Sequence, residues 1–372
     1  MKLGIIGLPQ SGKTTIFNAL TGGDKPVGQI AGGGRFEVNQ AVVAVPDERV
    51  DKLSALFKPK KTIYAQVIYA DIAGLEEGAG KSGFSGPLLN QLAQMEGFIH
   101  VVRAFENANV PHPGGSINPA RDVSALETDL LLQDLVAVER KLEKLADELR
   151  KGGVKDKTAA QREQALFQRL HEALSAEKPL REIELTHEED KSLSSYAFLT
   201  RKPLLTVINV GDEDQEELPA GVAVTGTARE PRANRSHVVV LRGRLEMEIA
   251  QLPPEDAAAF LADYGIAEPS LRRMIRLSYD LLGRQSFFTV GEDEVRAWTT
   301  RRGAMAAEAA GEIHTDLREG FIRAEVFSYA DLMEAGGVAE VKHKGKFRLE
   351  GKEYVVKDGD ILNIRFSPPA KK

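Results

Sequence analysis

The sequence of 372 residues predicts an α/β fold that is followed by a smaller β-rich domain. Two observations predict the first part: short apolar runs alternate with helical patterns as far as about residue 282, and a leucine-rich helical segment interrupts them. The third observation predicts the second part, because short strand patterns with turn signals follow from residue 283. Strands that alternate with helices build a mostly parallel sheet that is covered on both faces.

The apolar runs of the first part give the expected strands. We expect them at residues 3–6, 41–45, 65–71, 98–102, 204–208 and 237–241. Each run has the length of a strand buried in a parallel sheet, and turn or helical patterns separate the runs. The first run leads directly into a glycine and then into a helical pattern near Lys13, which predicts a strand–loop–helix unit.

The segment 124–197 predicts two antiparallel helices inserted between strands of the α/β domain. Its first helix carries apolar residues spaced 4, 3, 4, 3 and 4 apart, which form one seam: Leu131, Leu135, Val138, Leu142, Leu145 and Leu149. Gly152-Gly153 ends this helix, and a second helix carries Leu166, Leu170 and Leu174. Two interpretations stay open, namely a hairpin that packs only on itself and an arm that docks a partner.

The C-terminal part predicts a small mixed β-sheet around one helix. Strand patterns occupy 284–290, 294–300, 321–327, 346–349 and 361–366, and an alanine-rich helix occupies 304–310. The expected organisation is therefore an α/β domain at 1–123 and 198–282, a helical hairpin at 124–197 and a β-rich domain at 283–368.

Composition excludes several classes of protein. Lys and Arg number 49 against 55 Asp and Glu, a net charge of −6 that excludes a polycationic nucleic-acid coat, so we expect no DNA specificity. The absence of Cys excludes disulfide scaffolds, thiol catalysis and Cys-ligated metals, and makes the cytoplasm the expected location. No apolar run approaches the ~20 residues that a membrane helix needs, so we expect no membrane contact.

One motif predicts the chemistry. Residues 7–14, Gly-Leu-Pro-Gln-Ser-Gly-Lys-Thr, fit the eight-residue phosphate-loop pattern between a strand and a helix. Glycines let backbone N–H groups point at phosphate oxygens, the lysine reaches the β- and γ-phosphates, and the Thr14 hydroxyl can bind Mg²⁺. The residues expected to contact the nucleotide here are Gln10, Ser11, Gly12, Lys13, Thr14 and Thr15.

Two further segments extend this site. Asp71-Ile72-Ala73-Gly74 follows a strand, where nucleotide switch proteins place an Asp near Mg²⁺ and a Gly that meets the γ-phosphate. Leu75 stands next, so the water-orienting Gln of Ras-like proteins is missing.

Asn209-Val210-Gly211-Asp212 stands where GTP-binding proteins carry Asn-Lys-x-Asp, whose Asp reads guanine. Val210 replaces the Lys, which leaves the choice of base open. The stretch 241–245, with Arg242 and Gly243, is expected to complete the base site.

With these residues placed, the sequence resembles the YchF/Obg-like ATPase family of P-loop nucleotidases over nearly its whole length. The resemblance depends on the phosphate loop with residues 14–21 and on Val45-Pro46-Asp47-Glu48-Arg49, Asp71-Ile72-Ala73-Gly74-Leu75, residues 100–107 and residues 195–200. The most specific segments are 295–299, Ile313-His314-Thr315-Asp316 and Gly320-Phe321-Ile322-Arg323-Ala324-Glu325-Val326.

The resemblance implies a Ras-like G domain interrupted by a helical hairpin, with a C-terminal β-grasp (TGS) domain. It also implies an ATPase rather than a strict GTPase, and association with the ribosome. Two positions depart from the family pattern: Arg35 stands where the first switch has a Thr that binds Mg²⁺, and Asp212 stands where the family has Glu.

The roles of two histidines and of one basic cluster stay open. His112 matches a family position in the loop after the fourth strand, where an imidazole could orient or deprotonate the attacking water; the alternative is a His that fixes a surface loop. His100 lies within an apolar strand, which favours a core role. A basic cluster at 342–346, with Arg348 and Lys352, is expected to contact RNA or the ribosome, or simply to protect an exposed strand edge.

The leading hypothesis is a slow Mg²⁺-dependent nucleoside triphosphatase switch that acts on ATP more readily than on GTP, together with the ribosome. The first alternative is a GTP-specific Obg-like GTPase, favoured if Asp212 reads guanine. The second is a nucleotide-gated RNA- or ribosome-binding module with vestigial hydrolysis, which Arg35 and Leu75 would explain.

Overall fold

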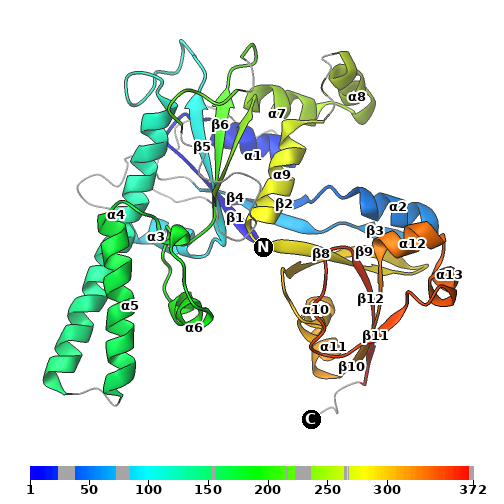
Figure 1. Ribbon diagram of the computed structural model, residues 1–372. Coiled ribbons are helices and arrows are strands. Elements are labelled where there is room, and N and C mark those ends of the chain that lie inside the picture. The colour runs from blue at the N-terminus through cyan, green and yellow to red at the C-terminus, as the bar shows by residue number, and fades with distance from the viewer. Residues whose placement is uncertain are drawn as a thin grey trace. The chain divides into compact units, whose positions relative to one another are not determined.

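The computed structural model describes residues 1–23, 38–72, 84–152, 156–214, 217–222, 236–263, 266 and 268–367. The chain forms two compact units, which are described separately (Figure 1). The first comprises Met1–Ala41 and Ile68–Met274, and the second comprises Val42–Val67 and Ile275–Lys372. Residues 42–67, expected in the nucleotide domain from their place in the sequence, are grouped with the C-terminal part in the compact units of the fold. The predicted domain boundaries stay a prediction.

The first unit is built on a six-stranded sheet with the strand order β2-β4-β1-β5-β6-β7. The strands are β1 (Lys2–Ile6), β2 (Val38–Ala44), β4 (Gln66–Ile72), β5 (Gly97–Ala104), β6 (Leu204–Val210) and β7 (Ser236–Leu241). Strands β4, β1, β5, β6 and β7 pair in parallel, so their carboxyl ends meet at one edge. Every residue of β6 is buried, as expected when both faces of a parallel sheet are covered. The predicted α/β class is confirmed.

The helices of this unit follow the strands in sequence. They are α1 (Lys13–Thr21), α3 (Gly86–Ala93), α4 (Pro119–Lys151), α5 (Lys157–Ser175), α6 (His187–Ser192), α7 (Gly243–Gln251) and α8 (Pro254–Asp263), with short 3₁₀ turns η1 (Leu180–Glu182) and η2 (Leu193–Ser195). Helix α9 (Ser270–Leu281) crosses the boundary between the units. No helix within the described ranges combines the length and apolar character needed to cross a membrane.

The predicted helical hairpin is present as α4 and α5, which lie side by side (Figure 1). Helix α4 ends at Gly152, whose φ of 67° is the left-handed conformation that favours glycine. The seam predicted from leucine spacing is buried: Leu131 and Val138 pack with Leu166 and Leu170 in one apolar cluster. Burial of this shared seam holds the two helices together.

A buried carboxylate joins the hairpin to the turn that precedes β6. Asp134 Oδ1 accepts a hydrogen bond from the Leu199 N–H at 2.8 Å, and Oδ2 accepts from the Thr200 N–H at 2.7 Å and the Thr200 hydroxyl at 2.6 Å. Burial raises the pKa of Asp134 to about 6, against the three hydrogen bonds that lower it. At neutral pH the carboxylate is therefore ionised and can accept all three bonds.

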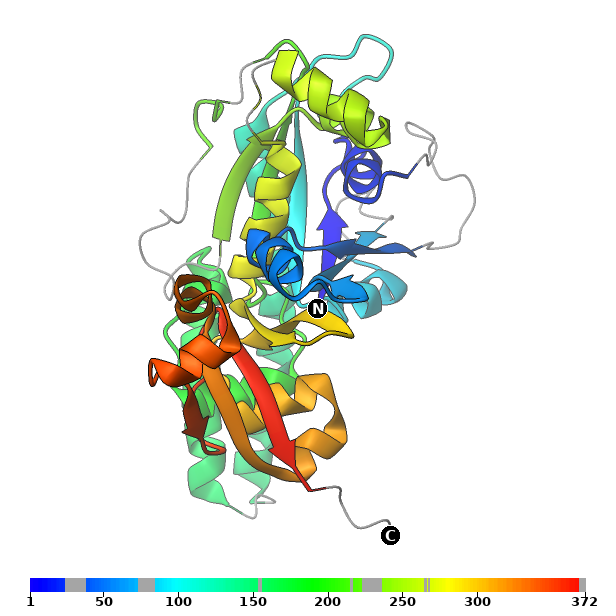
Figure 2. The ribbon, with the colours of Figure 1, turned by 90° about the vertical axis from the view of Figure 1, so that its right-hand side faces the viewer.

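The second unit has a six-stranded mixed sheet with the order β11-β10-β12-β8-β9-β3. Its elements are α2 (Glu48–Phe57), β3 (Lys61–Ile63), β8 (Arg284–Val290), β9 (Glu294–Arg301), α10 (Ala306–Ile313), α11 (Thr315–Glu319), β10 (Phe321–Ser328), α12 (Tyr329–Ala335), α13 (Val338–His343), β11 (Arg348–Glu350) and β12 (Asp360–Phe366). Figure 2 shows β10 and β12 side by side, where they pair antiparallel. The central pair β12–β8 is parallel.

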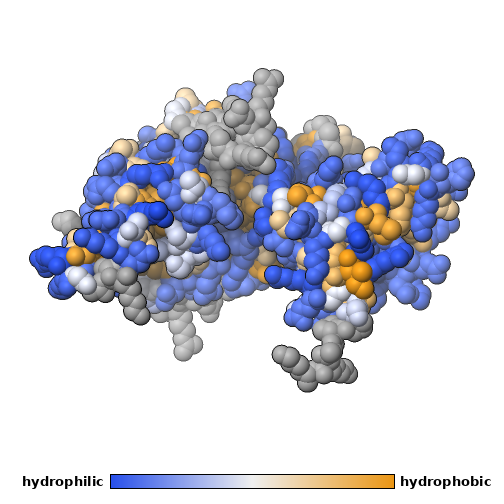
Figure 3. All heavy atoms as spheres, turned by 60° about the horizontal axis from the view of Figure 1, so that its bottom comes forward, coloured by the Kyte–Doolittle hydropathy of each residue, from blue (hydrophilic) through white to orange (hydrophobic). Residues whose placement is uncertain are grey.

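The core of the second unit lies between its sheet and α10. Ala306, Ala309 and Ala310 of α10 pack on Phe287 and Val326 of the sheet. Small alanine side chains let the helix approach the sheet closely, and the predicted helix over 304–310 is confirmed with a shift to Ala306–Ile313. The face of the molecule in Figure 3 is largely hydrophilic, with only small hydrophobic areas.

Candidate functional site

The phosphate-loop sequence forms the turn between β1 and α1, at the carboxyl edge of the parallel sheet. Gly7 has φ 149°, Gln10 has φ 59° and Gly12 has φ 97°. A β-carbon on Gly12 would lie 2.2 Å from Asn209 Nδ2, and one on Gly7 would lie 2.3 Å from the Val101 carbonyl oxygen. Both positions therefore require glycine, for the backbone conformation and for close packing.

Lys13 opens α1 and turns back over the loop. Its ammonium group donates hydrogen bonds to the carbonyl oxygens of Gly7 at 3.0 Å and Leu8 at 2.8 Å. This places a positive charge at the loop next to the N-terminus of α1, where the helix dipole also favours an anion. The arrangement suits a phosphate group.

Thr14 and Asp71 bring two oxygen ligands together. The Thr14 hydroxyl donates to Asp71 Oδ2 at 3.4 Å, although the two residues are 57 positions apart in sequence. Among the described residues, no group of three or more His, Cys, Asp or Glu is arranged to hold a metal. One carboxylate and one hydroxyl fit Mg²⁺ in a nucleotide site, because Mg²⁺ commonly completes its shell with water and substrate phosphates.

The other predicted phosphate-loop residues lie in or around the turn. Ser11 and Thr15 are buried, and Ser11 Oγ has no hydrogen-bond partner among the described side chains and backbone groups. Gln10 is partly exposed. The predicted contacts of Gly74, and the departures at Arg35 and Leu75, lie outside the described residues.

Asn209 links three loops of the site. Its Nδ2 donates to the Ser11 carbonyl oxygen at 3.1 Å, and its Oδ1 accepts from the Gly243 N–H at 2.9 Å. Gly243 must be glycine, because a β-carbon there would lie 2.6 Å from Asn209 Oδ1. Asn209 is thus a bridge between the phosphate loop and the start of α7, where Arg242 occupies the N-cap position without a side-chain capping hydrogen bond.

The loop predicted to contact the base has one carboxylate in position. Val210 packs in an apolar cluster with Val102, Ile208 and Val240, so only its backbone can meet a ligand. Asp212 Oδ2 lies 3.6 Å from Arg244 Nε, whereas the buried Oδ1 has no hydrogen-bond partner among the described residues. A carboxylate oxygen in this state is suited to accept an N–H group from a ligand.

His100 lies under the phosphate loop, on β5, and is buried as predicted. Burial, with a smaller contribution from the charge of Lys13, lowers the pKa of His100 to about 3. The ring is therefore neutral at physiological pH.

The pKa of His100 predicts a loss of stability in acid. A depressed folded-state pKa stabilises the fold above the unfolded value near 6.5, and this stabilisation is lost as the pH falls towards 3. Between pH 7.5 and pH 5, we expect wild type to lose about 2 kcal/mol more unfolding free energy than His100→Gln, which cannot titrate. Urea unfolding followed by circular dichroism at the two pH values measures the difference, and equal losses would contradict the assignment.

His112 is held in the loop 105–118, between β5 and α4. Its Nδ1 accepts a hydrogen bond from the Gly114 N–H at 3.0 Å, and its Nε2 lies 2.9 Å from Asp122 Oδ2. Only 5% of the side chain is exposed. This geometry favours the interpretation in which His112 fixes the loop in the described conformation, and a catalytic role stays a prediction.

Sequence reasoning missed the residues that fix this loop. Arg103 is buried at the end of β5 and donates to the carbonyl oxygens of Phe105 at 3.1 Å and Val110 at 2.8 Å. A charged residue directly after Val101-Val102 in an apolar strand was a usable signal. Arg121 and Asp122 carry no comparable signal in the sequence, because charged residues in the first turn of a helix are ordinary.

The basic cluster of the second unit is largely neutralised by its neighbours. Lys344 lies 3.5 Å from Glu334, Lys346 lies 3.5 Å from Asp331, and Arg348 lies 3.7 Å from Glu350. Lys342 is stacked over the Phe347 ring. Exposed pairs of this kind contribute little to stability, and they reduce the net charge available to an RNA phosphate.

The fold and the site together define a P-loop nucleotide-binding protein. Comparison with known proteins makes the assignment more specific. The family model for the 50S ribosome-binding GTPase matches residues 2–131, and the model YchF-GTPase_C, described as a protein of unknown function, matches residues 284–367.

Relatives match over the full length. The chain is 41% identical over 369 residues to the ribosome-binding ATPase YchF of Bacillus subtilis (strain 168), covering 98% of both chains. It is 40% identical to the protein of the same name from Escherichia coli O157:H7, over 98% of this chain and 99% of that one. The YchF GTPase structure of Schizosaccharomyces pombe aligns with a TM-score of 0.82 at 30% identity, covering 98% and 97%. The chain belongs to the YchF family, and the predicted family resemblance is confirmed.

Proposed function

We propose that the protein is a Mg²⁺-dependent nucleoside triphosphatase that hydrolyses ATP and acts with the ribosome in the cytoplasm. The phosphate loop carries this proposal, since its glycines, the Lys13 ammonium and the start of α1 converge on one anion site. Relatives named ribosome-binding ATPase support both the substrate and the partner. Contact with ribosomal RNA is part of the proposal. We also propose the division into a nucleotide domain at 1–123 and 198–282, a hairpin at 124–197 and a TGS-like domain at 283–368.

Each residue of the site has a role in this proposal. Backbone N–H groups of Gln10 to Thr15 would donate to phosphate oxygens, and Lys13 would balance the negative charge that spreads over the transferred phosphoryl group. Thr14 and Asp71 would hold Mg²⁺, which neutralises phosphate charge when bound. Gly74 would meet the γ-phosphate. Asn209 would keep the phosphate loop and the base loop in register, and Val210, Asp212, Arg242 and Gly243 would surround the base.

One observation favours a second candidate, a GTPase. The unpartnered Asp212 Oδ1 can accept the N1–H or amino group of guanine, whereas adenine offers only its 6-amino group. The name YchF GTPase of the Schizosaccharomyces pombe relative is consistent with this candidate. A third candidate, a nucleotide-gated ribosome-binding module with vestigial hydrolysis, predicts binding without turnover.

Calorimetric titration with non-hydrolysable ATP and GTP analogues, each with Mg²⁺, tests the substrate. We expect ATP to bind at least tenfold more tightly, a difference of ~1.4 kcal/mol. Asp212→Ala should then change ATP affinity little, because adenine needs this carboxylate less. A GTP preference that Asp212→Ala abolishes would establish the second candidate. Binding of neither nucleotide would overturn the proposal.

Turnover measured with and without ribosomes tests the proposed hydrolysis and the proposed action with the ribosome. We expect slow ATP hydrolysis by the protein alone and faster hydrolysis when purified ribosomes are added. Tight nucleotide binding with no hydrolysis under either condition would favour the vestigial module.

A further inference from the structure

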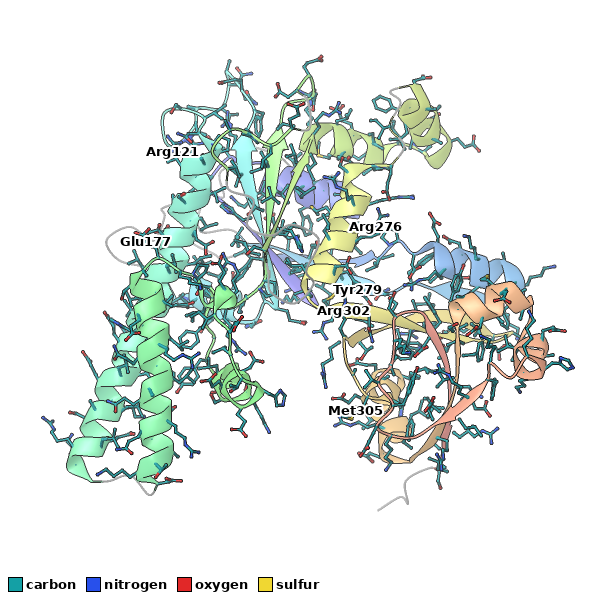
Figure 4. All side chains as sticks on the ribbon, in the orientation of Figure 1. Arg121, Glu177, Arg276, Tyr279, Arg302 and Met305 are labelled. Atoms are coloured by element: carbon teal, nitrogen blue, oxygen red, sulfur yellow. The ribbon has the colours of Figure 1, made fainter. Side chains whose placement is uncertain are left out.

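The second unit contains a cleft of about 270 Å³ between the hairpin of β8 and β9, helix α10 and the start of α11. The turn that joins β9 to α10 runs from Arg302 to Met305, both labelled in Figure 4, and its Ala304 lines the cleft. Three arginines line the same cleft, namely Arg284, Arg301 and Arg318. The cleft adjoins two of the most specific segments of the sequence, 295–299 and 313–316, and neither of them belongs to the phosphate loop or the base loop.

Two of these arginines face each other across the hairpin. Arg284 of β8 and Arg301 of β9 are register partners, and like charges directly opposite on paired strands destabilise a sheet. Glu308 reduces this repulsion, because Arg301 Nη2 donates to both of its carboxylate oxygens at 2.9 Å. The Met305 N–H bond, followed by the Arg301 bonds, holds the pKa of Glu308 below its ordinary value, so the carboxylate is ionised at neutral pH. Arg301 and Glu308 therefore neutralise each other at one wall of the cleft.

Arg318 reaches the cleft across a glycine. A β-carbon on Gly311 would lie 3.0 Å from Arg318 Cδ and 3.5 Å from its Cβ, so the stem of Arg318 lies directly against this position of α10. Arg318 forms no ion pair and no side-chain hydrogen bond with any residue that the structure describes. Glu312, the second carboxylate of the lining, likewise has no ion pair within the described ranges. Three arginines against two glutamates leave the cleft with one positive charge in excess.

The charge and size of the cleft define the class of ligand. Arginine presents its N–H groups in a planar fork that matches the oxygen atoms of carboxylates and phosphates. Arg284 and Arg318 belong to different elements, so an anion between them can be contacted from two sides, which suits a tetrahedral phosphate better than a planar carboxylate. A volume of about 270 Å³ is just below the ~300 Å³ at which pockets for drug-sized ligands begin, and it leaves room for a small group attached to the phosphate. An RNA strand fits poorly, because Glu308 and Glu312 would repel its further phosphates.

We propose that this cleft binds a small phosphate monoester, with Arg284 and Arg318 contacting the phosphate oxygens and Arg301 neutralising Glu308 beside them. The inference goes beyond the proposed function, because the cleft belongs to the second unit alone and no residue of the phosphate loop contributes to it. It stands or falls independently of nucleotide hydrolysis.

Calorimetric titration of the full chain with glycerol 3-phosphate tests the ligand, after a non-hydrolysable ATP analogue with Mg²⁺ has saturated the nucleotide site. We expect saturable binding with a dissociation constant of about 1 mM or tighter. Arg318→Gln should weaken it about tenfold or more, because it removes charge-assisted hydrogen bonds. Arg318→Lys should weaken it as well, because lysine keeps the charge but lacks the fork. Arg323→Gln is the matched control, since Arg323 is exposed in the same unit and does not line the cleft.

A second measurement locates the site. Phenylglyoxal modifies accessible guanidinium groups, and peptide mass spectrometry gives the rate at each arginine. We expect glycerol 3-phosphate to slow the modification of Arg318 severalfold and to leave that of Arg323 unchanged. Because residues 7–14 contain no arginine, binding at the phosphate loop would not give this pattern.

Three further ligands separate the sources of the phosphate. Dimethyl phosphate represents the diester of an RNA backbone, a single-stranded oligouridylate represents RNA itself, and inorganic phosphate lacks the ester group. We expect each of them to protect Arg318 less than glycerol 3-phosphate does. Equal or better protection by the diester or by oligouridylate would assign the cleft to RNA, and better protection by inorganic phosphate would assign it to the free ion; either result overturns the proposal. It is equally overturned if glycerol 3-phosphate leaves Arg318 unprotected, or if Arg318→Gln binds this ester as tightly as wild type.

Discussion

Lys13→Ala is expected to reduce nucleotide hydrolysis by about 10²- to 10³-fold, the cost of removing a preorganised group that stabilises charge in a transition state. The ammonium group is the cation of the phosphate loop, held by the carbonyl oxygens of Gly7 and Leu8. When a nucleotide enters, the same group can exchange these neutral acceptors for charged phosphate oxygens. Its interaction then strengthens as charge spreads over the transferred phosphoryl group.

Lys157→Ala is the matched control for this variant. Lys157 opens helix α5 and is exposed, so removing it changes the net charge equally without touching the site. Phosphate release measured at saturating ATP should fall only for Lys13→Ala, and circular dichroism should show both variants folded. Turnover of Lys13→Ala within threefold of wild type, at equal saturation, would contradict the role given to the phosphate loop.

The sequence was sufficient for the main features of the fold, for identifiable physical reasons. The leucine spacing of 124–197 predicted the hairpin because each helix has a single apolar seam. The two helices bury these seams by packing them against each other, and Leu131 and Leu170 lie in the resulting cluster. The phosphate loop could also be predicted from the sequence, because the left-handed backbone and the close packing at Gly12 exclude residues other than glycine.

The parts that sequence reasoning missed depend on contacts between distant segments. Strand β3 joins the sheet of the second unit by pairing with β9, where Lys61 is the register partner of Glu294. A strand of three residues is too short for its sequence pattern to predict such a pairing. Asn209 is predicted to bind the nucleotide, and this stays a prediction. Its bridge between Ser11 and Gly243, possible because an amide can donate and accept at once, has no signal in the local sequence. The pairing of His112 with Asp122 depends on how the loop folds back on α4, which spacing alone does not encode.

Asp134→Ala is expected to destabilise the first unit by about 3–5 kcal/mol, because it removes the acceptor of three buried hydrogen bonds. The substitution leaves the N–H groups of Leu199 and Thr200 and the Thr200 hydroxyl without their acceptor, and Thr200 is fully buried. Each buried donor without a partner costs roughly 1–3 kcal/mol. Asp134→Asn should cost less, because the amide keeps one oxygen acceptor, although its NH₂ group then faces donors.

Glu143→Ala is the matched control, because it removes an exposed carboxylate from the same helix and should change stability by less than about 0.5 kcal/mol. Urea unfolding by circular dichroism measures all three, and an Asp134→Ala protein as stable as Glu143→Ala would show that the hairpin is held by its apolar seam alone.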